Sequence, residues 1–191
     1  KTATMATATT TRSKLGGVYS AELIQKLDKK HHAILKAMRA EPGNRECAEC
    51  TASPTTWASV TLGVFVCMRC SQVHRNLGAH LSKVKSCMGT YLWCPDEIER
   101  MRELGNARVG RLYTGGAGTP PPCKPAAGAP FEEVDRYARD KYERRRWMMP
   151  GGMEAVLAEE RARPQQRADT AAAGAAADAG ARAEVGAAAR G

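Results

Sequence analysis

Hydrophobic and polar residues alternate at helical spacing after residue 19. Apolar side chains recur along one face, with Lys and Glu between them, at Leu23, Leu27, Ile34, Leu35 and Met38. This is the pattern of an amphipathic helix that turns one face to a core. Ser20 can cap its start and Pro42-Gly43 ends it, so we predict a helix over residues 20–41. The helix is expected to pack on the segments that follow; a position on a membrane surface is the alternative.

The pattern changes in residues 57–66, which read WASVTLGVFV. β-Branched and aromatic residues on both sides of Gly63 predict one or two short strands with a bend at the glycine. Helical patterns then return in four segments, over residues 68–77, 95–104, 106–113 and 131–146. A small sheet surrounded by about five helices predicts the α+β fold class.

Both ends of the chain lack such patterns. Residues 1–19 are rich in Thr and Ala, and residues 149–191 form a segment of low complexity dominated by Ala, Gly, Arg and Glu. Neither composition can bury a hydrophobic face, so we predict a disordered leader and a disordered tail. A targeting peptide is the alternative for the leader. The folded domain is expected to span residues 20–148.

Composition narrows the functions that such a domain can have. The 191 residues include 29 Lys and Arg against 20 Asp and Glu, which gives a formal charge of +9, and the excess lies in the first 150 residues. Such a surface favours an acidic partner, which can be nucleic acid, anionic lipid or an acidic protein face, but it is also typical of a basic surface with no specific partner. No apolar run reaches the roughly 18–20 residues of a transmembrane helix.

Four of the seven cysteines form two pairs with sixteen residues between them, Cys47-x2-Cys50 and Cys67-x2-Cys70. Each turn points two sulfurs at one place, and two such turns supply the four thiolates of a tetrahedral zinc site with Zn–S distances of about 2.3 Å. A site filled by four thiolates has no open position, so we predict one structural Zn²⁺ and a reducing compartment. The other cysteines are expected to be small apolar residues or free thiols: Cys87, Cys94 and Cys123.

The residues around the second pair carry a more specific signal. Residues 74–80 read HRNLGAH, and Trp57 precedes the pair. The series C-x2-C, sixteen residues, C-x2-C and then His-Arg-x-Leu-Gly-x-His resembles the Arf-GAP domain, which activates GTP hydrolysis by Arf-family small GTPases. The residues NRECAEC at 44–50, LGN at 104–106 and RDKYE at 139–143 extend the resemblance over residues 20–148. The last of these is similar to the small stromal-membrane-associated subgroup.

This resemblance implies a function and a set of site residues. The domain is expected to stimulate GTP hydrolysis on an Arf-family GTPase in its GTP form, with Arg75 as the arginine finger and Trp57 beside it on the partner surface. A guanidinium keeps its proton, and its planar fork can meet two phosphate oxygens of a transferring phosphoryl group. His74 and His80 are expected to form hydrogen bonds and not to bind metal.

The resemblance also implies where the protein works and what it lacks. The sequence has no GxxxxGK[ST] motif, so the nucleotide, Mg²⁺ and attacking water are expected to belong to the GTPase, and no independent enzyme activity is expected. We expect a cytoplasmic protein that associates peripherally with Golgi or endosomal membranes through the GTPase and binds no nucleic acid.

Two departures from the family pattern leave alternatives open. Gln72 stands where the family has Gly, and the segment 87–93 is one residue longer and lacks the Asp before Trp93. A catalytically weak scaffold that binds Arf is therefore one alternative. A GATA-like zinc module that binds nucleic acid is another, because its two C-x2-C turns have nearly the same spacing, although its basic tail follows the second turn directly.

Overall fold

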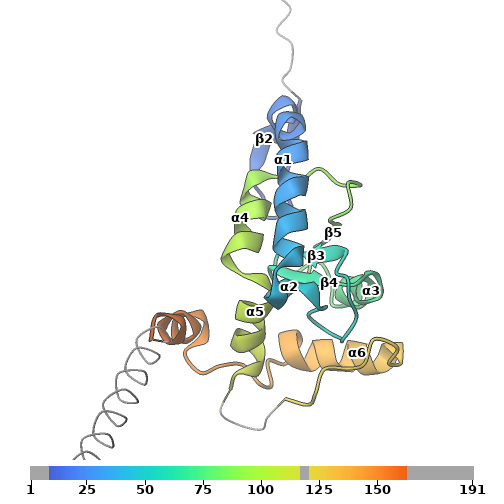
Figure 1. The fold of residues 1–191 in the computed structure, drawn as a ribbon, viewed down its shortest axis with the longest axis vertical. Helices are drawn as coiled ribbons and strands as arrows, with labels where there is room; N and C mark the ends of the chain where they lie inside the picture. The colour runs from blue at the N-terminus through green and yellow to red at the C-terminus, as the bar shows by residue number, and fades with distance from the viewer. Residues whose placement is uncertain (1–8, 117–120, 163–191) are drawn as a thin grey trace, which may run out of the picture. The chain divides into compact units, whose positions relative to one another are not determined.

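The computed structural model of the protein describes residues 9–116 and 121–162 (Figure 1). The chain forms two units, residues 1–149 and residues 150–191. The labelled strands and helices all belong to the first unit, which also holds the two cysteine pairs. Every helix among the described residues is too short or too polar to cross a bilayer.

The first helix, α1 (Ala21–Ala40), confirms the predicted amphipathic helix. The Ser20 hydroxyl accepts a hydrogen bond from the backbone N–H of Leu23, and the helix ends two residues before Pro42. Its buried face differs from the expected one in the first half. Leu23 is 41% exposed, and the residues that face the core are Ile24, His31, Leu35 and Met38.

A three-stranded antiparallel sheet forms the centre of the fold. Its order is β4 (Val64–Val66), β3 (Trp57–Ser59) and β5 (Val84–Ser86), with Trp57 opposite both Val66 and Ser86. The first two strands lie in the predicted segment 57–66, with Gly63 in the turn at a φ of +69°. A side chain there would also collide with Leu104, since a Cβ would lie 2.5 Å from its atoms. The third strand was not predicted, because Val-Lys-Ser is too short to show an alternating pattern.

Helices surround this sheet, and Figure 1 shows α4 beside α1 and α6 below α3. The four predicted helical segments are confirmed as α3 (Met68–Asn76), α4 (Pro95–Glu103), α5 (Gly105–Thr114) and α6 (Phe131–Ala138). Within the described residues of the first unit, two elements add to the five expected helices. One is the four-residue α2 (Pro42–Arg45), and the other is a π-helix, η1 (Arg139–Glu143), that continues α6.

Strand β4 separates two hydrophobic cores. Val64 and Val66 face the four cysteines, α3, α5 and α6, whereas Phe65 faces α1 and α4. This alternation follows from the two-residue period of a strand, and it explains why all three residues are apolar. Cys87 lies in the second core and Cys94 is also buried, as expected for small apolar residues, whereas Cys123 is exposed.

The predicted disordered leader is wrong for residues 9–19. Strands β1 (Thr10–Arg12) and β2 (Val18–Ser20) pair in an antiparallel hairpin. The hairpin is tied to the start of α4, because the Ser13 hydroxyl donates to Asp96 at 2.6 Å and the Lys14 N–H donates to Glu97 at 2.8 Å. These bonds span 83 residues, so no local pattern could reveal them. Residues 1–8 of the expected leader lie outside the described residues.

The predicted disordered tail is wrong for residues 152–162, which form a helix. Met, Leu, Glu and Ala dominate this stretch, and these are the residues with the highest intrinsic helix propensity. The expectation rested on the absence of a hydrophobic face and gave too little weight to propensity. The remaining tail, residues 163–191, lies outside the described residues.

Candidate functional site

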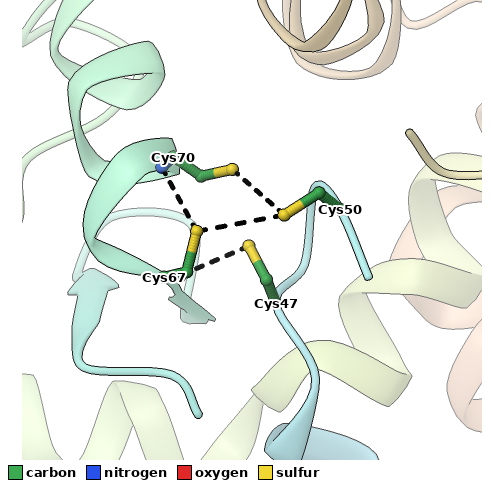
Figure 2. Close-up of side chains that lie close together, drawn as sticks. All are labelled: Cys47, Cys50, Cys67 and Cys70. Atoms are coloured by element: carbon green, nitrogen blue, oxygen red, sulfur yellow. Dashed lines mark hydrogen bonds between the residues drawn. The ribbon is translucent and has the colours of Figure 1, made fainter. Parts of the chain in front are cut away.

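The four cysteines of the two pairs converge at one point, as predicted (Figure 2). Cys47 and Cys50 lie in the loop before β3, Cys67 caps the N-terminus of α3, and Cys70 lies in its first turn. Their four sulfur atoms all lie within 4.8 Å of one another. The Cys50 sulfur is 3.9 Å from that of Cys67 and 3.6 Å from that of Cys70.

These distances fit a tetrahedral metal site. Four sulfurs that lie 2.3 Å from one metal ion are separated from each other by about 3.8 Å. Backbone N–H groups donate to the sulfurs, from Glu49 and Cys67 to Cys47 at 3.4 and 3.3 Å, and from Cys70 to Cys67 at 3.4 Å. Such donors favour the thiolate form that binds metal. Among the cysteines themselves, contact with Cys47 lowers the pKa of Cys50 to about 7, and contact with Cys50 raises the pKa of Cys47 well above its ordinary value.

The two residues predicted to face the GTPase are in contact. Arg75 lies on the exposed face of α3, and its guanidinium carbon is 4.7 Å from the ring centre of Trp57, at the start of β3. One guanidinium nitrogen also lies 3.4 Å from the Ser71 hydroxyl, one turn earlier on the helix. The half-buried indole therefore supports the arginine from the sheet side and restricts its orientations.

A third residue, the aromatic Tyr91, joins this pair and was missed by the sequence analysis. Its ring meets Trp57 edge to face, with centroids 6.1 Å apart and an interplanar angle of 65°. Tyr91 comes from the segment 87–93 that differs from the family pattern. The additional length of the segment was visible in the sequence, but nothing local indicated that its tyrosine would reach Trp57. Arg75, Trp57 and Tyr91 thus form a stack, which we call the finger stack.

A buried polar network contacts the inner face of α3 through His74. Glu49, inside the first cysteine pair, accepts hydrogen bonds from Tyr142 at 2.6 Å and Lys141 at 3.1 Å, and its carboxylate lies 3.3 Å from His74. The other ring nitrogen of His74 is 2.8 Å from the Ser82 hydroxyl. All of these side chains are buried. His74 therefore has the hydrogen-bonding role predicted for it, one residue before Arg75.

The charge on Glu49 is maintained in this buried place by its partners. Burial raises the pKa of a carboxyl group, but Lys141 and then His74 and Tyr142 outweigh burial and lower the pKa of Glu49 to about 2. The sequence analysis matched residues 44–50 and 139–143 to the family without a role for them. The structure supplies one, because these two segments meet in the network beneath α3.

The segment 87–93 lacks the aspartate of the family pattern, but hydrogen bonds from Lys85 and Trp93 hold its C-terminal end. The ammonium of Lys85, the middle residue of β5, donates to the Leu92 carbonyl at 2.6 Å and forms an ion pair with buried Glu97 at 2.5 Å. Trp93 is fully buried, and its indole N–H donates to the Ser86 carbonyl at 3.0 Å. Gln72, the other departure, is exposed on α3 and does not crowd the core.

Comparison with known proteins identifies the domain. The ArfGap family model, which describes a GTPase-activating protein for Arf, matches residues 32–151. The chain belongs to the ArfGap family. This confirms the predicted resemblance, and the α+β fold with its cysteine knuckle agrees with it.

Relatives and solved structures named for the same activity or domain match about two thirds or more of this chain. The Arabidopsis thaliana protein named "Probable ADP-ribosylation factor GTPase-activating protein AGD15" is 37% identical over 136 residues, which cover 70% of this chain and 54% of that protein. Stromal membrane-associated protein 1 of Mus musculus is 37% identical over 126 residues, 66% of this chain and 28% of that protein. The ArfGap domain of HIV-1 Rev binding protein superposes with a TM-score of 0.59 at 28% identity, covering 72% of this chain and 99% of that one. The chain thus spans about half or less of these two full-length relatives.

Proposed function

We propose that the protein stimulates GTP hydrolysis by an Arf-family small GTPase in its GTP form, with Arg75 as the arginine finger. One observation carries the proposal: Arg75 is exposed at the surface yet held by the Trp57 ring, on a helix fixed at its start by the cysteine cluster. An arginine that is accessible and already oriented loses little conformational freedom when it enters a partner's active site.

The chemistry expected of Arg75 is electrostatic. Charge on the transferring phosphoryl group shifts during hydrolysis, and a guanidinium supplied by the activator stabilises it. Within the described residues, only one guanidinium nitrogen of Arg75 makes a hydrogen bond, the long one to Ser71, so the group has donors available for phosphate oxygens. The nucleotide, Mg²⁺ and the attacking water would come from the GTPase.

The metal implied by the family is Zn²⁺, and we propose that one ion is bound by the four cysteines. Thiolate ligands in a tetrahedral arrangement suit zinc, and a site without an open position has a structural role. Bound zinc would contribute directly to folding free energy. In this chain its ligands would fix the first turn of α3, which carries Arg75.

Single-turnover hydrolysis on GTP-loaded Arf tests the finger. Arg75→Ala and Arg75→Lys should both lower the stimulated rate, by about 10³-fold or more for Ala, because Lys lacks the planar fork. Arg69→Ala is the matched control, since Arg69 lies on the same helix and is also exposed. Equal rates for wild type and both Arg75 variants would overturn the proposal. Tight binding of GTP-loaded Arf without acceleration would instead identify the scaffold alternative.

The same proposal places the protein in the cytoplasm, at Golgi or endosomal membranes. Peripheral association would follow from binding an Arf GTPase. Localisation of the wild-type chain beside an Arf-binding-deficient variant would test whether the GTPase alone recruits it.

A further inference from the structure

Exposed hydrophobic side chains gather in one short segment of the fold. Six large hydrophobic residues among the described ones are exposed, and three of them lie within the five residues 88–92. Met88 is 61% exposed, Leu92 43% and Tyr91 38%. We call this segment the apolar loop. Single exposed hydrophobic residues are common, but a cluster on a loop tip is typical of a surface that contacts another apolar phase or partner.

A basic groove adjoins the apolar loop. It has a volume of about 540 Å³ and lies between the exposed side of α1, α2 and the loops at Pro54 and at 87–89. Three permanent cations line it, Lys36, Arg39 and Arg45, and no carboxylate among the described residues does so. Its other walls are largely apolar and include Ala40 and Met88. Met88 therefore belongs to both the groove and the apolar loop.

The cations of the groove lack acidic partners. None of the three forms an ion pair within the described residues, although many other basic side chains of the chain do. Arg39 donates to the Thr55 carbonyl and to the Met88 sulfur, and Arg45 donates to the Ala40 carbonyl at 3.1 Å. Two guanidinium groups are thus held at the groove while their charge stays uncompensated. The groove residue His32 lies 3.2 Å from Asp28, one turn earlier on α1.

We propose that the basic groove and the apolar loop form a membrane-docking surface that binds anionic phospholipid directly, without the GTPase. The cations would bind phosphate-bearing headgroups, while Met88 and Leu92 would enter the boundary between headgroups and acyl chains. Lys and Arg near an anionic leaflet are attracted to it, and apolar side chains beside them add burial. A groove of this volume matches a small headgroup better than the flat surface of a protein partner.

Vesicle co-sedimentation without any GTPase tests this proposal. The full chain should bind vesicles of phosphatidylcholine with phosphatidylserine better than vesicles of phosphatidylcholine alone, and added salt should weaken the binding. Lys36→Glu with Arg45→Glu should lower the partition coefficient by roughly 25-fold or more, since each cation contributes about fivefold at the surface. Arg39 is left unchanged because its guanidinium links α1 to two distant segments, through the Thr55 carbonyl and the Met88 sulfur.

Matched controls separate a defined site from general positive charge. Lys29→Glu with Lys30→Glu makes the same charge change at two exposed positions of α1 that lie outside the groove. For the apolar loop, Met88→Ser with Leu92→Ser should weaken vesicle binding. Val18→Ser with Leu23→Ser removes comparably exposed hydrophobic residues elsewhere and should not. Circular dichroism of each variant confirms that it is folded.

The outcomes decide the proposal independently of the proposed GTPase stimulation. Selective loss of vesicle binding in the groove and loop variants supports it. Absence of binding by the wild-type chain, or equal loss in the Lys29/Lys30 control, overturns it. Retained vesicle binding by the groove variant, combined with lost stimulation of soluble Arf, also overturns it and assigns the groove to a protein partner.

Discussion

At the scale of single residues, the candidate site depends on contacts between segments that are distant in sequence. Arg75 was predicted from its motif, and so was Trp57, but their stacking is visible only in the structure. Tyr91 had no predictive signal, because an aromatic ring in a loop is not informative until its partner is known. The cysteine cluster and the proposed finger could be predicted from motifs, whereas the tyrosine that packs against Trp57 could not.

Tyr91→Ala should lower the stimulated hydrolysis rate by about two- to tenfold, because an edge-to-face aromatic pair contributes about 0.5–1.5 kcal/mol. Tyr91→Phe keeps the ring and should retain the wild-type rate. Single-turnover hydrolysis on soluble GTP-loaded Arf measures both. Leu92→Ala is the control in the same loop, and a rate for Tyr91→Ala equal to that of this control would show that the ring does not orient the finger.

The buried charges beneath α3 make a second prediction at this scale. Lys141→Met should lower the free energy of unfolding by about 3–5 kcal/mol, because it leaves the fully buried Glu49 carboxylate without its cation. Denaturant titration at saturating zinc measures this change. Arg102→Ala breaks an exposed pair with Glu99 and should change stability by less than about 1 kcal/mol. Similar losses for the two variants would contradict the role of the network.

At the scale of elements, prediction succeeded where a pattern was long. The twenty-residue α1 and the helices α3 to α6 were found from their hydrophobic periodicity and from the Pro and Gly residues at their ends. Errors fell on short elements held by distant partners. Strand β5 has three residues, and the buried face of α1 includes His31, whose ring nitrogen is 2.7 Å from the Trp93 carbonyl. A polar residue in a core is recognised only when its partner is known.

Helix α3 should depend on metal, since Cys67 and Cys70 form its first turn. A strong chelator should therefore remove one zinc per chain and abolish much of the far-ultraviolet helical signal, and zinc should restore it. Metal analysis beside circular dichroism measures both effects. Cys70→Ser should lower zinc content, whereas Cys123→Ser, at an exposed cysteine outside the cluster, should not. An unchanged melting temperature after complete zinc removal would count against a structural role.

At the scale of the whole molecule, the boundaries of the domain were the least predictable feature. Composition indicated low complexity at both ends, but it carried no information about the bonds between the β1–β2 hairpin and α4. The charge of the chain was also ambiguous by itself. The structure adds the positions of the basic residues: one arginine lies in the finger stack, and three cations line the basic groove.

The hairpin gives a prediction about those boundaries. Deletion of residues 1–19 should lower the free energy of unfolding by about 1–3 kcal/mol, because it removes the partners that Ser13 and Lys14 provide to the acidic start of α4. Deletion of residues 1–8 is the control and should leave stability unchanged. Thermal and denaturant unfolding measure both. Equal stability of the two shortened chains would mean that the hairpin adds nothing to the domain.

The buried network has a consequence for the order in which parts of the protein fold during synthesis on the ribosome. All four cysteines have been synthesised by residue 70, so the knuckle can form early. The ammonium that compensates Glu49 comes 92 residues after that carboxylate, from η1. Until Lys141 and Tyr142 emerge, Glu49 has to remain hydrated, since burying it alone would be costly. Helix α3, which carries Arg75, is therefore expected to reach its final packed position only when nearly the whole domain has left the exit tunnel.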